Sequence, residues 1–198
     1  MVKRSFFLFI IILFTYGVLS AQNGDIEHWN NQRLNLQETG MLVLGSWALV
    51  NFSFSGYKMT QTTGNEYYFH QMNVFWNTVN AGIATAGYLS VANAEPGLSQ
   101  QELLMEYNNF SKILLLNTGL DLAYMGAGLF LKERSRNVTK HSQRLKGYGN
   151  SLLLQGGFLF VFDLIMVLKN EQLTQQFIEQ TNISLSFTPG GFSFLMSF

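Results

Sequence analysis

The segment Lys132-Glu-Arg-Ser-Arg-Asn-Val-Thr-Lys-His-Ser-Gln-Arg-Leu-Lys146 joins two apolar stretches and decides how this chain is organised. The stretches, residues 113–131 and 147–168, contain one charged residue each, Asp121 and Asp163, and each has about the ~20 residues that a helix needs to cross a bilayer. The segment between them has the positive bias of a cytoplasmic loop. Its basic residues are Lys132, Arg134, Arg136, Lys140, Arg144 and Lys146. The pattern predicts two membrane helices joined by a cytoplasmic basic turn.

The composition excludes several classes of function. Only 12% of the 198 residues are charged, against roughly 25% in soluble domains, and the net charge is zero, so nucleic acid is not an expected partner. The chain has no cysteine, which excludes disulfides and thiolate chemistry. No phosphate-binding loop, nucleophile elbow or metal-ligand spacing occurs. We therefore predict no cofactor, no metal and no enzymatic activity.

The amino terminus has the layout of a secretory signal peptide. Lys3 and Arg4 precede an apolar core, and the small residues Ser20 and Ala21 follow it. The core is shorter than a spanning helix needs. We predict that residues 1–21 are a signal peptide, cleaved after Ser20 or Ala21, with an uncleaved signal anchor as the alternative.

Windows poor in charge predict four membrane spans, at about residues 39–57, 70–92, 112–131 and 148–168. The first two are diluted by glycine and asparagine. The connection at residues 93–111 contains three acids, Glu95, Glu102 and Glu106, and no lysine or arginine, which favours the outer side. Signal peptide and loop charges agree on a membrane protein whose mature termini both lie on the side opposite the basic turn. With the bacterial envelope setting that the resemblance below implies, this becomes an inner-membrane protein with both mature termini in the periplasm.

The predicted fold class is mainly α: an antiparallel four-helix transmembrane bundle over residues 22–180, with a C-terminal β-hairpin. Ser99 and Glu102 form a capping box, so the third helix should run from near Gln100 to about Glu133. The fourth should continue as a polar extension to Gln180. Residues 181–198 alternate apolar and small residues around a Pro-Gly turn, which predicts a periplasmic hairpin. Such a hairpin needs a surface to lie on, because two strands alone are marginal in water.

Three asparagines, Asn73, Asn77 and Asn80, lie at helical spacing with Ala84 and form one helix face. Amide side chains are costly in lipid, so this face should turn inward. Two interpretations stay open: interhelical hydrogen bonds that fix packing, and a polar passage or ligand cavity.

The two intramembrane acids are the sharper candidates, because a charged residue within a span is by default a functional-site hypothesis. Counting outward from the basic turn, we expect Asp121 to contact Gln155, and Asp163 to pair with Lys112 or Asn117. This count places the acids about two helical turns apart, which argues against a shared-proton pair. They are either structural links between helices or groups that handle protons or cations.

Four runs, at residues 33–49, 69–77, 117–126 and 144–159, carry a resemblance to a known family. Together they resemble a family of small, signal-peptide-bearing, uncharacterised membrane proteins of Bacteroidota-type bacteria, over about residues 30–168. The resemblance implies a bacterial envelope setting. It brings no known activity, cofactor or catalytic residue.

The leading functional hypothesis is a structural or partner-binding role, in which the hairpin and helix ends meet another envelope protein or a second copy of the chain. The alternative is a small transporter or channel component that uses Asp121, Asp163 and the asparagine face. An intramembrane enzyme ranks third.

Overall fold

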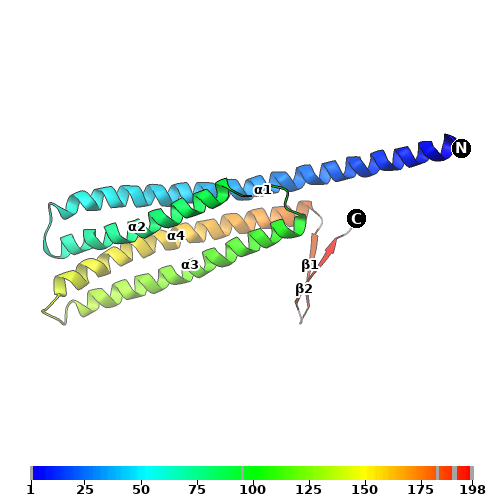
Figure 1. The fold of residues 1–198 in the computed structure, drawn as a ribbon. Helices are drawn as coiled ribbons and strands as arrows, with labels where there is room; N and C mark the ends of the chain where they lie inside the picture. The colour runs from blue at the N-terminus through cyan, green and yellow to red at the C-terminus, as the bar shows by residue number, and fades with distance from the viewer. Residues whose placement is uncertain (1, 95, 182, 189–190, 197–198) are drawn as a thin grey trace.

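Four helices make up most of the protein (Figure 1). The computed structural model describes residues 2–94, 96–181, 183–188 and 191–196. The helices are α1 (Val2–Met59), α2 (Gly64–Ala92), α3 (Gln100–Arg134) and α4 (Ser142–Gln180). Helix α1 extends far beyond the other three at its N-terminal end (Figure 1). It passes through residues 20 and 21 without a break, and cleavage there stays a prediction.

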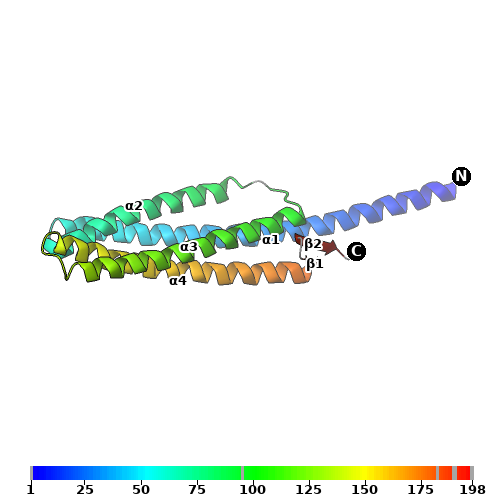
Figure 2. The same cartoon turned by 90° about the horizontal axis from the view of Figure 1, so that it is seen from below.

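Two helical hairpins lie side by side. Helix α3 packs most extensively against α4, and α1 against α2, while α2 joins the two hairpins by packing along α4. Helices α2 and α3 make no close backbone contact. Figure 2 shows α2 diverging from α3 towards its C-terminal end. The bundle is therefore closed along α2–α4 and open on the side between α2 and α3.

The predicted start of the third helix is confirmed. The Ser99 hydroxyl accepts a hydrogen bond from the backbone amide of Glu102, and the Glu102 carboxylate accepts one from the Ser99 amide. This capping box satisfies amides that a helix start leaves free. The C-terminal extension of α4 to Gln180 is confirmed as well.

Glycines set the close approach of α3 and α4. A Cβ atom added at Gly149 would lie 2.6 Å from the Gly128 carbonyl oxygen, and one at Gly128 would lie 2.8 Å from the Gly149 oxygen. One at Gly156 would lie 2.9 Å from Met125 Cγ. Because these sites have room only for hydrogen, the two backbones touch along most of their shared length.

The interior changes character along the bundle. At the end where α3 begins, apolar side chains from α1, α3 and α4 are buried together, as in a soluble protein; they are Trp29, Leu103, Leu104, Tyr107 and Phe177. Helix α2 ends before this level, so this end is a three-helix head.

In the middle of the bundle, polar side chains are buried and large apolar side chains are exposed. Alongside a few apolar side chains it buries polar ones, among them Ser55, His70, Asn73, Asn77, Asn80, Asp121, Ser151, Gln155 and Asp163. Large apolar side chains cover the outside of all four helices, for example Val50, Phe75, Leu116 and Leu168. An apolar exterior around a polar interior is the pattern expected of a protein in lipid.

Two of the described helices, α3 and α4, are long and apolar enough to cross a membrane. Over the residues that the structure describes in full, α1 and α2 do not meet this test. The glycine, serine and asparagine residues that dilute their sequences lower their mean hydropathy. Length and composition thus support two of the four predicted spans.

The predicted fold class is wrong as a description of the fold, because the β-hairpin is no component of it. Strands β1 (Ile183–Thr188) and β2 (Gly191–Met196) pair antiparallel, with Ile183 opposite Met196. Of the four helices, β1 meets only α4, the helix that it follows. Apart from this contact with α4, the hairpin does not pack on the helices, so the packed fold is formed by helices alone.

Candidate functional site

The carboxyl groups of Asp121 on α3 and Asp163 on α4 lie close enough to interact directly. Both residues are buried, with 3% and 5% of their surface exposed. Two ionised carboxylates this close repel each other strongly, so the arrangement favours a state in which one of them carries a proton. The two acids are therefore the candidate site for proton exchange.

The predicted depths of the two acids agree with the backbone, but the conclusion that their carboxyl groups stay apart was wrong. The count separated the two residues by about two turns along the bundle axis. Their backbones are separated by about this much, because the Asp121 carbonyl lies beside Gly156, which precedes Asp163 by seven residues on α4. However, helical side chains lean towards the N-terminus of their own helix. Because α3 and α4 are antiparallel, Asp121 and Asp163 lean towards each other, and their carboxyl groups meet.

Within the described residues, none of the predicted partners, Gln155, Lys112 and Asn117, forms a hydrogen bond or an ion pair with either acid. Both side-chain polar atoms of Gln155 are engaged elsewhere, since Trp47 Nε1 donates to its Oε1 at 2.9 Å and its Nε2 donates to Asn73. Lys112 is exposed and forms no ion pair within the described residues, and Asn117 is half-buried. The sequence identified the two acids but not what each of them contacts.

A hydrogen-bonded network fills the bundle between the acid pair and the end at which α2 begins. Asn73 Oδ1 accepts from Gln155 Nε2 and from Ser151 Oγ, both at 2.8 Å. Asn73 Nδ2 donates to Ser55 Oγ at 3.2 Å, and His70 Nδ1 lies 3.2 Å from the same oxygen. The asparagine face thus turns inward, as its spacing predicted. Ser55, His70 and Ser151 were missed, because single polar residues in an apolar run give no periodic signal.

Four buried polar atoms near the acid pair have no hydrogen-bond partner among the described residues: Trp76 Nε1, Asn77 Oδ1, Asn80 Nδ2 and Asp121 Oδ2. Their residues lie close together along the bundle axis. The rings of Trp76 and Tyr124 meet edge to face at 4.7 Å, which brings this part of α2 level with α3 one turn from Asp121. Asn77 and Asn80 follow Trp76 within about one turn. Buried polar atoms are normally satisfied, so a cluster of exceptions marks a candidate site.

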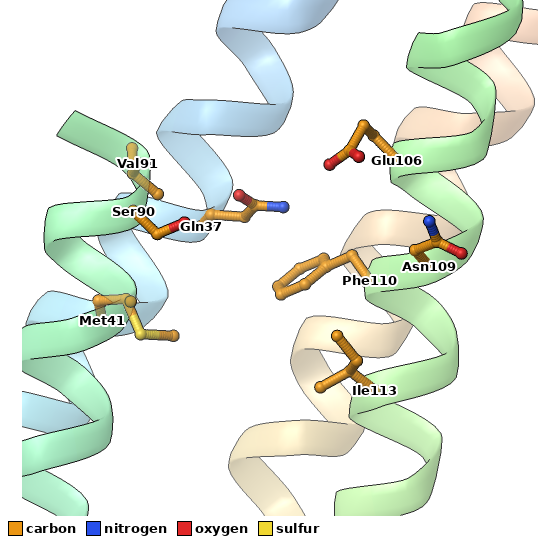
Figure 3. Close-up of a pocket in the computed structure, with 9 residues that line it drawn as sticks. Gln37, Met41, Ser90, Val91, Glu106, Asn109, Phe110 and Ile113 are labelled. Carbon is orange, nitrogen blue, oxygen red and sulfur yellow. The ribbon is translucent and has the colours of Figure 1, made fainter. Parts of the chain in front are cut away.

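A pocket of about 280 Å³ lies on the open side of the bundle, between α1 and α2 on one wall and α3 on the other (Figure 3). Gln37, Ser90, Glu106 and Asn109 supply its polar groups. Phe110 projects across the gap from α3 in Figure 3. Its remaining lining residues are Met41, Gly87, Val91 and Ile113. None of the nine residues was predicted as a site residue.

Beside the pocket, an ion pair ties the head together. Arg33 Nη1 donates to Glu106 Oε2 at 3.0 Å, and Arg33 Nε and Nη2 donate to Asn30 Oδ1. Burial lowers the pKa of Arg33, and Glu106 partly restores it. Tyr107 donates its hydroxyl to the Trp29 carbonyl at 2.9 Å, and burial raises the pKa of Tyr107 to about 12. This end of the pocket is rigidly held.

The basic residues of the α3–α4 turn lie at one end of the bundle, away from the acid pair (Figure 1). Arg136 forms an exposed ion pair with Glu133 at 2.7 Å. Within the described part of the chain, no three histidine, aspartate or glutamate side chains are grouped so as to hold a metal ion.

The model of a family of unknown function (DUF6992) matches residues 43–164, which is more than half of the chain. The match includes both acids, the asparagine face and the basic turn. No curated protein matches the chain. No solved structure matches it either.

Proposed function

The chain belongs to this family of unknown function, so its activity has to be inferred from its own residues, and we propose that it is an integral membrane protein that moves protons. In this proposal, the pair Asp121–Asp163 takes up and releases the proton, and the protein acts as a small transporter or channel component. The observation that carries the proposal is the contact of two buried carboxyl groups in the middle of the bundle.

The membrane setting is supported by the surface of the bundle. Its outside is apolar at the levels where its inside is polar, and α3 and α4 are long and apolar enough to span. In the proposal all four helices cross the bacterial inner membrane, since α1 and α2 carry the same apolar exterior as α3 and α4. The basic α3–α4 turn then lies in the cytoplasm, and both mature termini lie in the periplasm.

The chemistry of the pair favours protons. Within the described residues, neither Asp121 nor Asp163 forms an ion pair with a lysine, an arginine or a histidine. A proton is therefore the charge that balances them, and its loss would leave a second, unbalanced negative charge in the bundle. That cost couples the protonation of the pair to any movement that admits water or a cation.

A structural role is the second candidate, and one observation favours it. Trp47, Gln155, Asn73, Ser151 and Ser55 satisfy one another through short hydrogen bonds, which fixes how α1, α2 and α4 pack. In this candidate the acid pair pins α3 to α4 and moves nothing.

Proton flux into proteoliposomes distinguishes the two candidates. The purified protein is reconstituted with a pH-sensitive dye inside the vesicles, and a pH gradient or membrane potential is applied. Asp121→Asn and Asp163→Asn should each abolish flux while the protein still inserts. Glu171→Gln makes the same change at an exposed acid of α4 and should leave flux unchanged.

Normal flux in both aspartate variants would refute the proposal. The structural candidate predicts that result, together with a lower unfolding temperature for both variants. Flux that is absent from the wild-type protein under both driving forces would refute the proposal as well.

A further inference from the structure

One face of α3 runs from the pocket to the acid pair and beyond it. Its residues follow one another at spacings of three and four, which places them on one side of a helix. In order they are Glu106, Phe110, Ile113, Asn117, Asp121 and Tyr124. The first three line the pocket, the fourth is half-buried and the fifth is buried. From the pocket inward, Ile113 is 57% exposed, Asn117 is half-buried and Asp121 is 3% exposed.

A face of α2 runs in the opposite direction beside the gap between α2 and α3, which we call the seam. Its Gly87 and Ala84 pack against Met41 and Gly45 of α1. The face follows the same spacing through Val91, Gly87, Ala84, Asn80, Asn77 and Asn73. Val91 and Gly87 line the pocket, and the other four are buried. The two faces approach the bundle centre from one pocket.

The seam is open at one end and closed at the other. At the pocket, α2 and α3 stand apart, and Figure 3 shows side chains from both walls with space between them. On the far side of the acid pair, the Trp76 and Tyr124 rings meet at 4.7 Å and close it. Beyond them, the Asn73, Ser151 and Ser55 side chains are hydrogen-bonded to one another.

The unpartnered atoms lie at the inner end of this seam, and their chemistry indicates what could satisfy them. Two are donors, Trp76 Nε1 and Asn80 Nδ2, and two are acceptors, Asn77 Oδ1 and Asp121 Oδ2. A metal cation binds acceptors alone and would leave both donors unsatisfied. Water both donates and accepts, and buried waters typically bond to such otherwise unsatisfied groups.

We infer that the seam between α2 and α3 is a water-filled path that connects the acid pair to one side of the membrane only, through the pocket at Glu106 and Phe110. The inference rests on the proposed function, because it gives the proton of the acid pair its route. It adds that the transported species is the proton in its hydrated form and not a metal cation. The ring contact of Trp76 and Tyr124 is the barrier towards the basic turn.

Cysteine accessibility tests the path directly, because the chain contains no cysteine of its own. The full-length protein carries one introduced cysteine at a time, in sealed vesicles. The probe is a charged, membrane-impermeant thiosulfonate, which needs a hydrated thiolate to react. Phe110→Cys tests the pocket and Asn117→Cys the seam. Leu116→Cys, next in the chain but 65% exposed on the apolar exterior, is the matched control. Ser151→Cys lies beyond the barrier.

Phe110→Cys and Asn117→Cys should react from the side that carries the α2–α3 connection, and Asn117→Cys at least about tenfold faster than Leu116→Cys. Ser151→Cys should not react from that side. The inference is overturned if Asn117→Cys is as slow as Leu116→Cys, or if Ser151→Cys reacts as fast as Asn117→Cys. Should Asn117→Cys not fold, Ile113→Cys replaces it with the same criterion.

The two proposals fail separately. If Asn117→Cys is labelled slowly but flux depends on the aspartates, the water-filled path is refuted and proton movement is retained. If Asn117→Cys is labelled fast but Asp121→Asn leaves flux unaffected, the hydrated seam is retained and proton movement by the acid pair is refuted. A flux driven by a sodium gradient, with no response to a pH gradient, would overturn the choice of the proton.

Discussion

Replacing Gly149 by alanine should force α3 and α4 apart, and the size of the effect follows from the geometry. The new Cβ atom would lie 2.6 Å from the Gly128 carbonyl oxygen and 3.0 Å from the Lys132 amide nitrogen. Both are backbone atoms, which cannot move aside as a side chain can. The helices must therefore separate at their closest contact.

Overpacking of this kind costs about 1–3 kcal/mol. Alanine within a helix returns roughly 0.5–1 kcal/mol of that, because glycine loses more conformational entropy on folding. The net loss is therefore roughly 0–2.5 kcal/mol, centred near about 1 kcal/mol, and the central value corresponds to a fall in Tm of about 2–4 °C for a chain of this size.

Gly126→Ala is the control, because a Cβ atom there meets nothing within 4 Å. It lies on α3 near Gly128, and it should raise Tm by about 1–4 °C through helix propensity alone. The assay is thermal unfolding in detergent, followed by circular dichroism. If Gly149→Ala is as stable as Gly126→Ala, then α3 and α4 are not packed backbone to backbone, and the contact of the two acids loses its basis.

Two further predictions concern the head. Burial raises the pKa of Tyr107 to about 12, above its ordinary value of 10.0, so the folded state disfavours the tyrosinate. The contribution of the neutral Tyr107 side chain to the free energy of unfolding is therefore complete below pH 10 and is lost as the pH rises towards 12. Unfolding followed by tryptophan fluorescence should show this alkaline loss in the wild type, and Tyr107→Phe should weaken it; equal pH dependence in both would contradict the burial of the hydroxyl. Arg33→Lys should cost about 1–3 kcal/mol, because a lysine ammonium lacks the planar fork with which Arg33 binds Asn30 through Nε and Nη2 and Glu106 through Nη1. Glu106→Gln should cost less than about 1 kcal/mol, since Glu106 is half exposed. A larger loss of Tm for Glu106→Gln than for Arg33→Lys would reverse this assignment.

Local sequence signals located the helices well. The capping box placed the start of α3 at Gln100, because the hydrogen bonds that begin a helix involve neighbours in the chain. The spacing of Asn73, Asn77 and Asn80 placed them on an inward face, because helical periodicity is fixed by the backbone. Neither conclusion needed the position of another helix.

Contacts between helices were predicted poorly. Counting residues outward from the basic turn gave Asp121 the wrong partner, since it tracks the backbone and ignores the direction in which side chains lean. The pocket was missed because its walls come from α1, α2 and α3, and its width depends on the divergence of α2 from α3. No single stretch of the sequence contains that information.

The sequence by itself determined the start of α3, the polar extension of α4, the apolar character of both helices and the identity of the two acids within them. Only the tertiary structure decided that these acids meet. In an antiparallel pair, side chains on the two helices lean in opposite directions, and the glycine contacts bring α3 and α4 close enough for the carboxyl groups of Asp121 and Asp163 to approach each other. The basic turn of residues 132–146 fixes the pairing of the two helices, while the packing along them creates the site.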